Sequence, residues 1–521
     1  MNKICRLIWS EIKRTWVAVS EITRGRGKCS SGVVSDLVGS GELANGITRE
    51  QCGFFVTASF SPAILAFAIA SIGTAYAGPV PTQLPTGGQL AAGSASISQN
   101  GSTLNINQST NRAAINWQTF NVGSAAQVNY NQPSTRSVTL NAILDSNPSQ
   151  IYGQLKANGQ VFFTNPNGMY FAPGASVNVG GLVATTHTIS TTDFMNGNYV
   201  FNRNGATGTI KNDGNLTASL GGYIALLAPQ VINNGIIIAK MGTVALAAGE
   251  AYTLQFDGNS TLADIAVTPA TIAALVQNGN AVQAPGGLII LSAQAADSLQ
   301  GGVVNNTGAL EATRLNNVDG RIVLGGNALV HTGSVTASNI TANVGNLIDA
   351  GTWDASAASN GMANGGTIAI NATGGVEQTM VGNINADGGN GGSVRIAAGA
   401  SAYLSGTISA SGATGQGGHI AATAPNLTLA GATLHADGAT GGGTLSIGGG
   451  WHGEDASLAN ADTTYVGVGS TLTANATQNG NGGRVVLWSG EQTSFAGAIE
   501  AKGGAQSGNG VLTRAEKYPV L

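Results

Sequence analysis

The chain has 521 residues, of which 78 are Gly, 9% are charged and 5% are aromatic, whereas an ordinary soluble domain has about 25% charged residues and about 7% Gly. This composition excludes a typical globular enzyme, and the 42% of apolar residues together with only three Cys exclude extended disorder and a disulfide scaffold. The formal net charge of −4 offers no basic excess, so we expect no nucleic-acid partner.

Residues 1–77 have the three parts of a secretory signal. Residues 1–28 carry seven basic and two acidic side chains, residues 54–73 carry no charge, and Ala75 and Ala77 supply the small residues that a signal peptidase reads. We expect the export machinery to move the chain and the peptidase to cut after Ala77, which also removes all three Cys. The alternative is a membrane anchor, because the apolar run has about the 20 residues that span a bilayer.

Three blocks at the start of the chain, MNKICRLIW, VAVSE and RGRGK, all lie within residues 1–28. In this order they resemble the extended signal peptide region of large Gram-negative exoproteins. The resemblance implies export through the periplasm to the cell surface or the medium.

The chain that follows the signal has the pattern of short strands. Runs of four to six alternating residues stand between Asn-Gly, Asp-Gly and Gly-Gly turns, which predicts strands rather than helices. Residues 80–110 include the alternating stretch SISQNGSTLNINQS, which we expect to cap the N-terminal edge of the fold. The best helix candidate is the short segment Pro269–Gln277.

Four blocks follow one another between residues 115 and 186. They are INWQTFNVG with the nearby VNY and QPS, then NPSQIYG, then NPNG, and finally GLVATT. In this order they resemble the secretion domain of filamentous haemagglutinin-type exoproteins, the passenger partner of two-partner secretion. The resemblance implies an all-β fold, a right-handed parallel β-helix (β-solenoid) with an N-terminal β cap. It also implies that a dedicated outer-membrane β-barrel transporter of the two-partner secretion type recognises this domain.

Two segments of these blocks form the secretion motif that the resemblance marks, namely Asn147–Pro148 and Asn165-Pro166-Asn167-Gly168. The second segment is a turn on its residues alone, because Pro suits the second turn position and Asn-Gly tolerates a left-handed backbone. The segments either contact the transporter or shape the folded domain, and we favour the shaping role.

Gly pairs recur later in the chain, each directly before an alternating apolar run. Their spacings are 26, 26, 25 and 40 residues, at Gly365-Gly366, Gly391-Gly392, Gly417-Gly418, Gly442-Gly443 and Gly482-Gly483. A unit of about 20–26 residues is the size of one solenoid coil, and the mature chain then predicts about 20 coils. The alternative, a string of β-sandwiches, predicts more aromatic core residues and no Gly-Gly repeat.

No catalytic constellation stands out, so we expect no enzyme, no cofactor and no metal. Pectin-cleaving β-helices need several carboxylates and a basic residue in one groove. Here the close acidic pairs Glu454/Asp455 and Asp349/Asp354 are expected to be solvated surface. The five His have no metal-ligand spacing, and no G-x-S-x-G nucleophile elbow occurs.

We predict four regions along the chain: an extended signal peptide over residues 1–77, a secretion domain over 78–250, β-helix repeats over 251–510 and a tail over 511–521. Each coil that emerges from the cell is expected to dock on the previous coil, which drives export without ATP.

The polar Ser, Thr, Asn and Gly surface favours an adhesin or haemagglutinin-like exoprotein that contacts a host or neighbouring-cell surface. The alternative is a haem- or haem-carrier-binding exoprotein for nutrient capture, which needs inserted loops with His or aromatic residues. His331 and Trp353 give that alternative slight support. A contact-dependent toxin is disfavoured, because no compact charged domain follows the repeats.

Overall fold

The computed structural model describes residues 5–10, 15–20, 78–258, 261–297 and 301–510. The chain divides into two units, Met1–Ala58 and Ser59–Leu521. In the first unit, β1 (Cys5–Ser10) pairs antiparallel with β2 (Thr15–Ser20). The predicted cleavage residues Ala75 and Ala77 and the predicted tail lie outside the described residues. No helix in the described ranges is long and apolar enough to cross a membrane.

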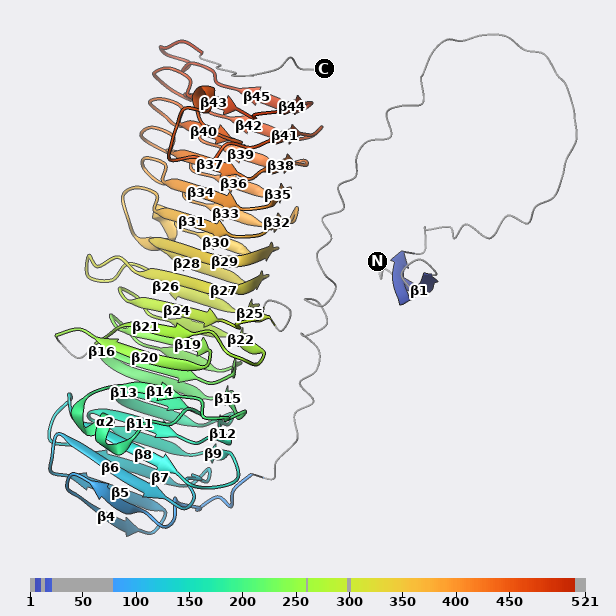
Figure 1. Cartoon of the computed structure of the whole chain (residues 1–521). Helices are drawn as coiled ribbons and strands as arrows, with labels where there is room; N and C mark the ends of the chain where they lie inside the picture. The colour runs from blue at the N-terminus through green and yellow to red at the C-terminus, as the bar shows by residue number, and fades with distance from the viewer. Residues whose placement is uncertain (1–4, 11–14, 21–77, 259–260, 298–300, 511–521) are drawn as a thin grey trace, which may run out of the picture. The chain divides into compact units, whose positions relative to one another are not determined.

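The second unit is a stack of coils in which each strand pairs in parallel with strands of the coils before and after it (Figure 1). Three faces of strands run along the stack. The first face consists of β5 (Thr103–Gln108), β7 (Gln127–Asn131), β10 (Gln154–Ala157), the first halves of β13 (Ser176–Thr185) and β16 (Asn215–Leu227), β18 (Ile236–Ile238), β23 (Ala281–Gln283), β26 (Ala309–Ala312), β28 (Ser334–Ala337), β30 (Thr352–Asp354), β33 (Asn383–Asn385), β36 (Thr407–Ser409), β39 (Thr433–His435), β42 (Thr471–Thr473) and β45 (Ala498–Glu500).

The second face consists of β6 (Arg112–Trp117), β8 (Val138–Ile143), β11 (Gln160–Thr164), the second halves of β13 and β16, β19 (Thr243–Ala248), β24 (Leu288–Ala293), the first halves of β27 (Arg321–His331) and β29 (Asn339–Asp349), β31 (Thr367–Ala372), β34 (Ser393–Ala398), β37 (His419–Thr423), β40 (Thr444–Ile447) and β43 (Arg484–Leu487). The third face consists of β9 (Ser149–Ile151), β12 (Gly168–Phe171), β15 (Thr209–Asn212), β17 (Gln230–Asn233), β22 (Ala274–Asn278), β25 (Gly302–Asn306), the second halves of β27 and β29, β32 (Val376–Gln378), β35 (Ser401–Leu404), β38 (Asn426–Leu429), β41 (Thr463–Val466) and β44 (Gln492–Phe495).

Alternation within each strand produces the core. In β34, for example, Val394 and Ile396 are buried while Ser393 and Arg395 point outward and are half-buried. The inward apolar residues of successive coils form one continuous core from Leu84 to Leu487. This arrangement confirms the predicted all-β parallel β-helix.

The Gly pairs allow neighbouring coils to approach closely at one corner. A Cβ on Gly392 would lie 2.2 Å from the carbonyl oxygen of Gly366, and a Cβ on Gly418 would lie 2.1 Å from the carbonyl oxygen of Gly392. The residues that follow the pairs stack in register, for example Thr367 on Ser393. Only glycine fits such a contact, which explains the repeat.

The coils are fewer and longer than the sequence predicts. Among the described residues the first face has fifteen strands, not about 20. One coil takes 18 residues, from Ser334 to Thr352, whereas another takes 45, from Ile237 to Val282. Inserted segments therefore account for the shortfall.

The N-terminal edge is covered by antiparallel strands. β3 (Gln89–Ala92) pairs with β6, and β4 (Ala95–Asn100) pairs with β5. The strand edge of the first coils is thereby paired rather than open, which removes an aggregation hazard. The predicted N-terminal cap over residues 80–110 is confirmed.

An outer sheet lies beside the second face and was not predicted. It consists of β14 (Val200–Asn202), β20 (Ala251–Phe256) and β21 (Leu262–Thr268), all antiparallel, and is preceded by α2 (Thr191–Asn196). Phe194, Phe201 and Tyr252 of these elements are buried against a second core cluster that includes Phe162 and Tyr223 of the β-helix. The outer sheet thus buries a second group of aromatic side chains, which lie outside the interior of the coils.

The predicted helix at Pro269–Gln277 is wrong. Its second half enters strand β22, which pairs with β17 and β25. Parallel pairing on both edges outweighs the weak local preference of a short segment for helix. The described ranges also include α3 (Ala357–Asn360) and a short 3-10 turn, η2 (Trp451–Gly453), both in loops between strands.

Candidate secretion site

The two segments of the predicted motif form stacked corners of neighbouring coils. Asn147–Pro148 links β8 to β9, and Asn165–Gly168 links β11 to β12. Because β8 pairs with β11 and β9 pairs with β12, both corners turn from the second face to the third at the same position of the coil. The structure therefore brings together residues that are 18 positions apart in sequence.

Asn165 joins the two corners through its buried side chain. Its Nδ2 donates to the carbonyl oxygen of Asn147 at 3.1 Å and to Oγ of Ser149 at 2.9 Å, and its Oδ1 accepts from the amide of Asn167 at 3.0 Å. The backbone amide of Asn165 donates to the carbonyl oxygen of Thr185 in the next coil at 3.0 Å. One residue thus ties three successive coils.

The corner residues differ in exposure. Asn165 and Gly168 are buried, Pro148 and Pro166 are half-buried, and Asn147 and Asn167 are exposed. Gly168 has a φ of +105°, and a Cβ there would lie 2.5 Å from the carbonyl oxygen of Thr209. Glycine is therefore required by both the backbone angle and the close approach of β15.

Asp145 is a corner residue that the sequence analysis missed. Its carbonyl oxygen accepts from Nδ2 of Asn167 at 2.7 Å, and its Oδ1 accepts from the backbone amide of Asn147 at 3.0 Å. The signal for it was present, because an Asp two residues before a turn residue commonly accepts that residue's amide.

The aromatic residues of the resembling blocks pack beneath these corners. Trp117, Phe120 and Phe163 are buried, with ring centroids 5.3 Å apart for the first pair and 4.9 Å for the second. Asn141 Oδ1 accepts from Nε1 of Trp117 at 2.9 Å and from the hydroxyl of Tyr130 at 3.0 Å. Burial raises the pKa of Tyr130 well above its usual value, so its hydroxyl remains a donor. These contacts hold side chains of the blocks inside the coils.

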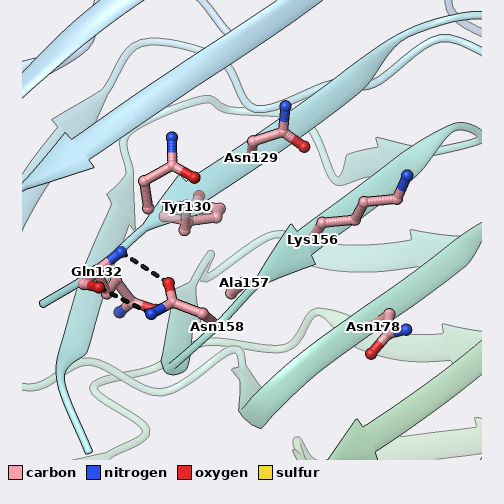
Figure 2. A pocket seen from close by; sticks show the side chains of 8 residues that line it. Asn129, Tyr130, Gln132, Lys156, Ala157, Asn158 and Asn178 are labelled. Atoms are coloured by element: carbon pink, nitrogen blue, oxygen red, sulfur yellow. Dashed lines mark hydrogen bonds between the residues drawn. The ribbon is translucent and has the colours of Figure 1, made fainter. Parts of the chain in front are cut away.

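Gln132 of the QPS block fixes another corner. Its Nε2 donates to the carbonyl oxygens of Ser137 and Gln160 at 3.1 and 2.9 Å. Its backbone amide donates to Asn158 Oδ1, and Asn158 Nδ2 donates to the Gln132 carbonyl oxygen, each at 2.7 Å (Figure 2). The paired bonds between Gln132 and Asn158 connect the coil of β7 to the coil of β10.

A shallow groove of about 490 Å³ opens beside Gln132 on the outer side of the first face. Figure 2 shows the side chains of Asn129, Lys156 and Asn178 along it, from β7, β10 and β13. Lys156 and Asn178 are exposed. The groove therefore offers amide groups and one cation to a partner without opening the core.

The other residues that the sequence singled out lie in later coils, away from the motif corners. Among the residues described, no group of three or more His, Cys, Asp or Glu side chains is placed to hold a metal ion. His331 and Trp353 are fully buried, with ring centroids 5.0 Å apart. Asp455 is exposed as expected, but the expectation that Asp349 is solvated surface is wrong, because it is 1% exposed.

Comparison with known families identifies the domain that contains these corners. The family model of the TPS secretion domain matches residues 82–337, and the model of the extended signal peptide of the type V secretion system matches residues 1–46. The chain belongs to the two-partner secretion exoproteins. Such an exoprotein leaves a Gram-negative cell through the periplasm, and its secretion domain implies a cognate outer-membrane transporter.

Two curated relatives of this exoprotein come from Haemophilus influenzae, and both are named heme/hemopexin-binding protein. One is 34% identical over 249 residues, covering 46% of this chain and 27% of the relative, and the other is 28% identical over 244 residues, covering 42% and 26%. The chain thus spans about a quarter of the length of these relatives.

Two solved structures are also similar to the exoprotein. The HMW1 secretion domain from Haemophilus influenzae is 23% identical, with a TM-score of 0.46, covering 83% of this chain and 99% of that one. The filamentous hemagglutinin secretion domain is 17% identical, with a TM-score of 0.34, covering 61% and 96%.

Proposed function

We propose that the exoprotein is an adhesin or haemagglutinin-like protein that acts by surface contact rather than by catalysis. The observation that carries this proposal is that outward amide side chains bond to one another between neighbouring coils. Asn129 Nδ2 donates to Asn105 Oδ1 at 3.0 Å, and Asn131 Nδ2 donates to Asn107 Oδ1 at 2.8 Å. A regular polar face of this kind supports extended contact with a host or neighbouring-cell surface.

We also propose that the groove at Lys156 and Asn178 is where the transporter contacts the secretion domain, while the motif corners shape the fold. The reason is the difference in exposure between the two groups of residues. The buried side chain of Asn165 forms hydrogen bonds within the domain, whereas Lys156 and Asn178 lie exposed in the same part of the stack.

Coexpression with and without the cognate transporter tests both proposals. Full-length chain should appear in the medium or on the surface only with the transporter, and Lys156→Glu with Asn178→Ala should reduce that amount at unchanged stability. Lys240→Ala, an exposed lysine on a later coil, is the matched control. Secreted protein should then bind host cells saturably. Normal secretion of the groove variant contradicts the contact proposal, and absence of cell binding contradicts the adhesin proposal.

A second candidate function, capture of haem or a haem carrier, is favoured by one loop. Residues 448–461, inserted between β40 and β41, carry Trp451 and His452, whose ring centroids lie 4.5 Å apart. Arg484 lies over the Trp451 ring at 5.6 Å. The buried His331 and Trp353 do not support this function, whereas the loop has the residue types that it needs.

Titration of the secreted protein with haemin tests the second candidate. A Soret-band shift that is lost in His452→Ala supports it, and His435→Ala, on β39 of the same coil, is the control. An unchanged spectrum in the wild-type protein contradicts it.

A further inference from the structure

A ladder of buried polar side chains runs along the third face. Asn212, Asn233, Asn278 and Asn306 occupy the same register position in successive coils. Each Nδ2 donates to the Oδ1 of the next residue at 2.8 Å, and Asn306 continues to Nδ1 of His331 at 3.2 Å. Up to this point every member has a partner in the next coil.

The chemistry of the ladder changes at Asp349, which stacks on His331 in register. Asp349 Oδ1 accepts from the amide of Gly351 at 3.1 Å and from Nε1 of Trp353 at 3.0 Å. Its Oδ2 is buried and has no hydrogen-bond partner. A buried carboxyl is costly to ionise, and burial raises the pKa of Asp349 to about 7, so at neutral pH it is ionised only in part unless a paired charge or a bound cation stabilises the carboxylate.

Three further polar atoms lie buried and unpartnered on the next coil, just above this carboxylate. They are Oε1 and Nε2 of Gln378, which stacks on Asp349 in register, and Oγ1 of Thr379. Gln378 is 1% exposed, and the neighbour above it in register is the apolar Leu404. The ladder of satisfied amides therefore ends at a small group of unpartnered polar atoms, three oxygens and one amide nitrogen.

Gly382 lines the same place. A Cβ on Gly382 would stand 3.1 Å from Oδ2 of Asp349, 2.7 Å from Cγ of Gln378 and 3.2 Å from the carbonyl oxygen of Thr379. The turn over residues 379–382 therefore lies against Asp349. Gly382 faces the carboxylate on the side where any other residue would carry its Cβ atom.

We propose that Asp349, Gln378 and Thr379 bind a monovalent cation, sodium in the surroundings of the secreted protein. The donors are a carboxylate, an amide oxygen and a hydroxyl, all hard oxygen ligands of the kind that such ions prefer. One carboxylate supplies one negative charge, which a monovalent ion balances. The two ring nitrogens of His331 below bond to Asn306 and to the carbonyl oxygen of Thr352 rather than to Asp349, and Glu377 alternates to the outer side of β32.

Hydrogen exchange of the secreted chain tests the site, in sodium chloride against N-methyl-D-glucamine chloride at equal ionic strength. At a sodium concentration ten times the dissociation constant, bound sodium lowers the hydrogen-exchange rate about eleven-fold. This slowing should appear at residues 379–382. Glu377→Gln, which removes a neighbouring outward charge, should retain the effect. Asp349→Asn should lose it and still fold, because an amide continues the ladder below.

A crystal of the same protein soaked in thallium chloride gives a second readout. An anomalous peak between Asp349 and Gln378 supports the site. Hydrogen exchange that does not depend on sodium overturns the proposal. The buried atoms would then satisfy each other through a hydrogen bond from Gln378 Nε2 to Asp349 Oδ2. Protection by calcium alone overturns it as well, because the ion would then be divalent.

Discussion

Replacement of Asn165 by alanine tests whether the secretion motif shapes the domain. The buried side chain makes three hydrogen bonds, a buried one to Ser149 and part-buried ones to Asn147 and Asn167. At about 1 kcal/mol each, Asn165→Ala should destabilise these coils by about 3 kcal/mol. We expect faster hydrogen exchange over residues 165–168 and a matching loss of transporter-dependent secretion.

Asn147→Ala is the discriminating control. The structure uses the backbone carbonyl oxygen of Asn147, whereas its exposed side chain bonds only to Asp145 among the described residues, at 3.1 Å. A shaping role therefore predicts near-normal stability and secretion for this variant. If Asn147→Ala abolishes secretion while the domain stays folded, or if Asn165→Ala is secreted normally despite its lost stability, the shaping argument is refuted.

Three further predictions concern the same domain. Gly168→Ala should cost about 1–3 kcal/mol and impair secretion, whereas Gly174→Ala, with a φ of +90° but no atom within 4 Å, should show strain without a clash. Phe163→Ala should lower urea stability by about 3–5 kcal/mol, and Leu144→Ala, which is 71% exposed, by less than about 0.5 kcal/mol. Burial lowers the pKa of His187 to about 4, so stability that is present above pH 6.5 is lost as pH falls toward 4, by about 3 kcal/mol. His187→Gln should remove that pH dependence in urea unfolding; an unchanged profile contradicts it.

Local signals were enough to predict that the chain forms coils and where the Gly pairs set their register, but not how many coils there are. The Gly pairs mark the corner where coils approach most closely, so the spacing of Gly391-Gly392 and Gly417-Gly418 gives the register directly, as Ser393 pairs with His419. The interval of 40 residues before Gly482-Gly483 likewise marks an insertion. Turn chemistry placed Asn165–Gly168 at a corner, although only the structure shows what that corner contacts.

Non-local pairing could not be predicted in the same way. AYTLQF of β20 has the alternation of any other strand, and its partner β14 is a three-residue segment about 50 positions earlier. Nothing in either segment specifies antiparallel pairing outside the coil. Asp349 has the same limitation, because its burial comes from the coils above and below it and not from its neighbours in sequence.

The outer sheet adds one folding step to export, which occurs at a fixed point in the chain rather than once for each coil. Every coil pairs only with its neighbours, so it can form soon after it emerges, but β14 finds β20 and β21 only once residues up to Thr268 are outside. At that moment aromatic residues such as Phe201 and Tyr252 pack over the second face against Phe162 and Tyr223 of earlier coils. We therefore expect the sheet to act as a latch: before it closes, the early coils can unwind one by one, and afterwards they must be withdrawn together.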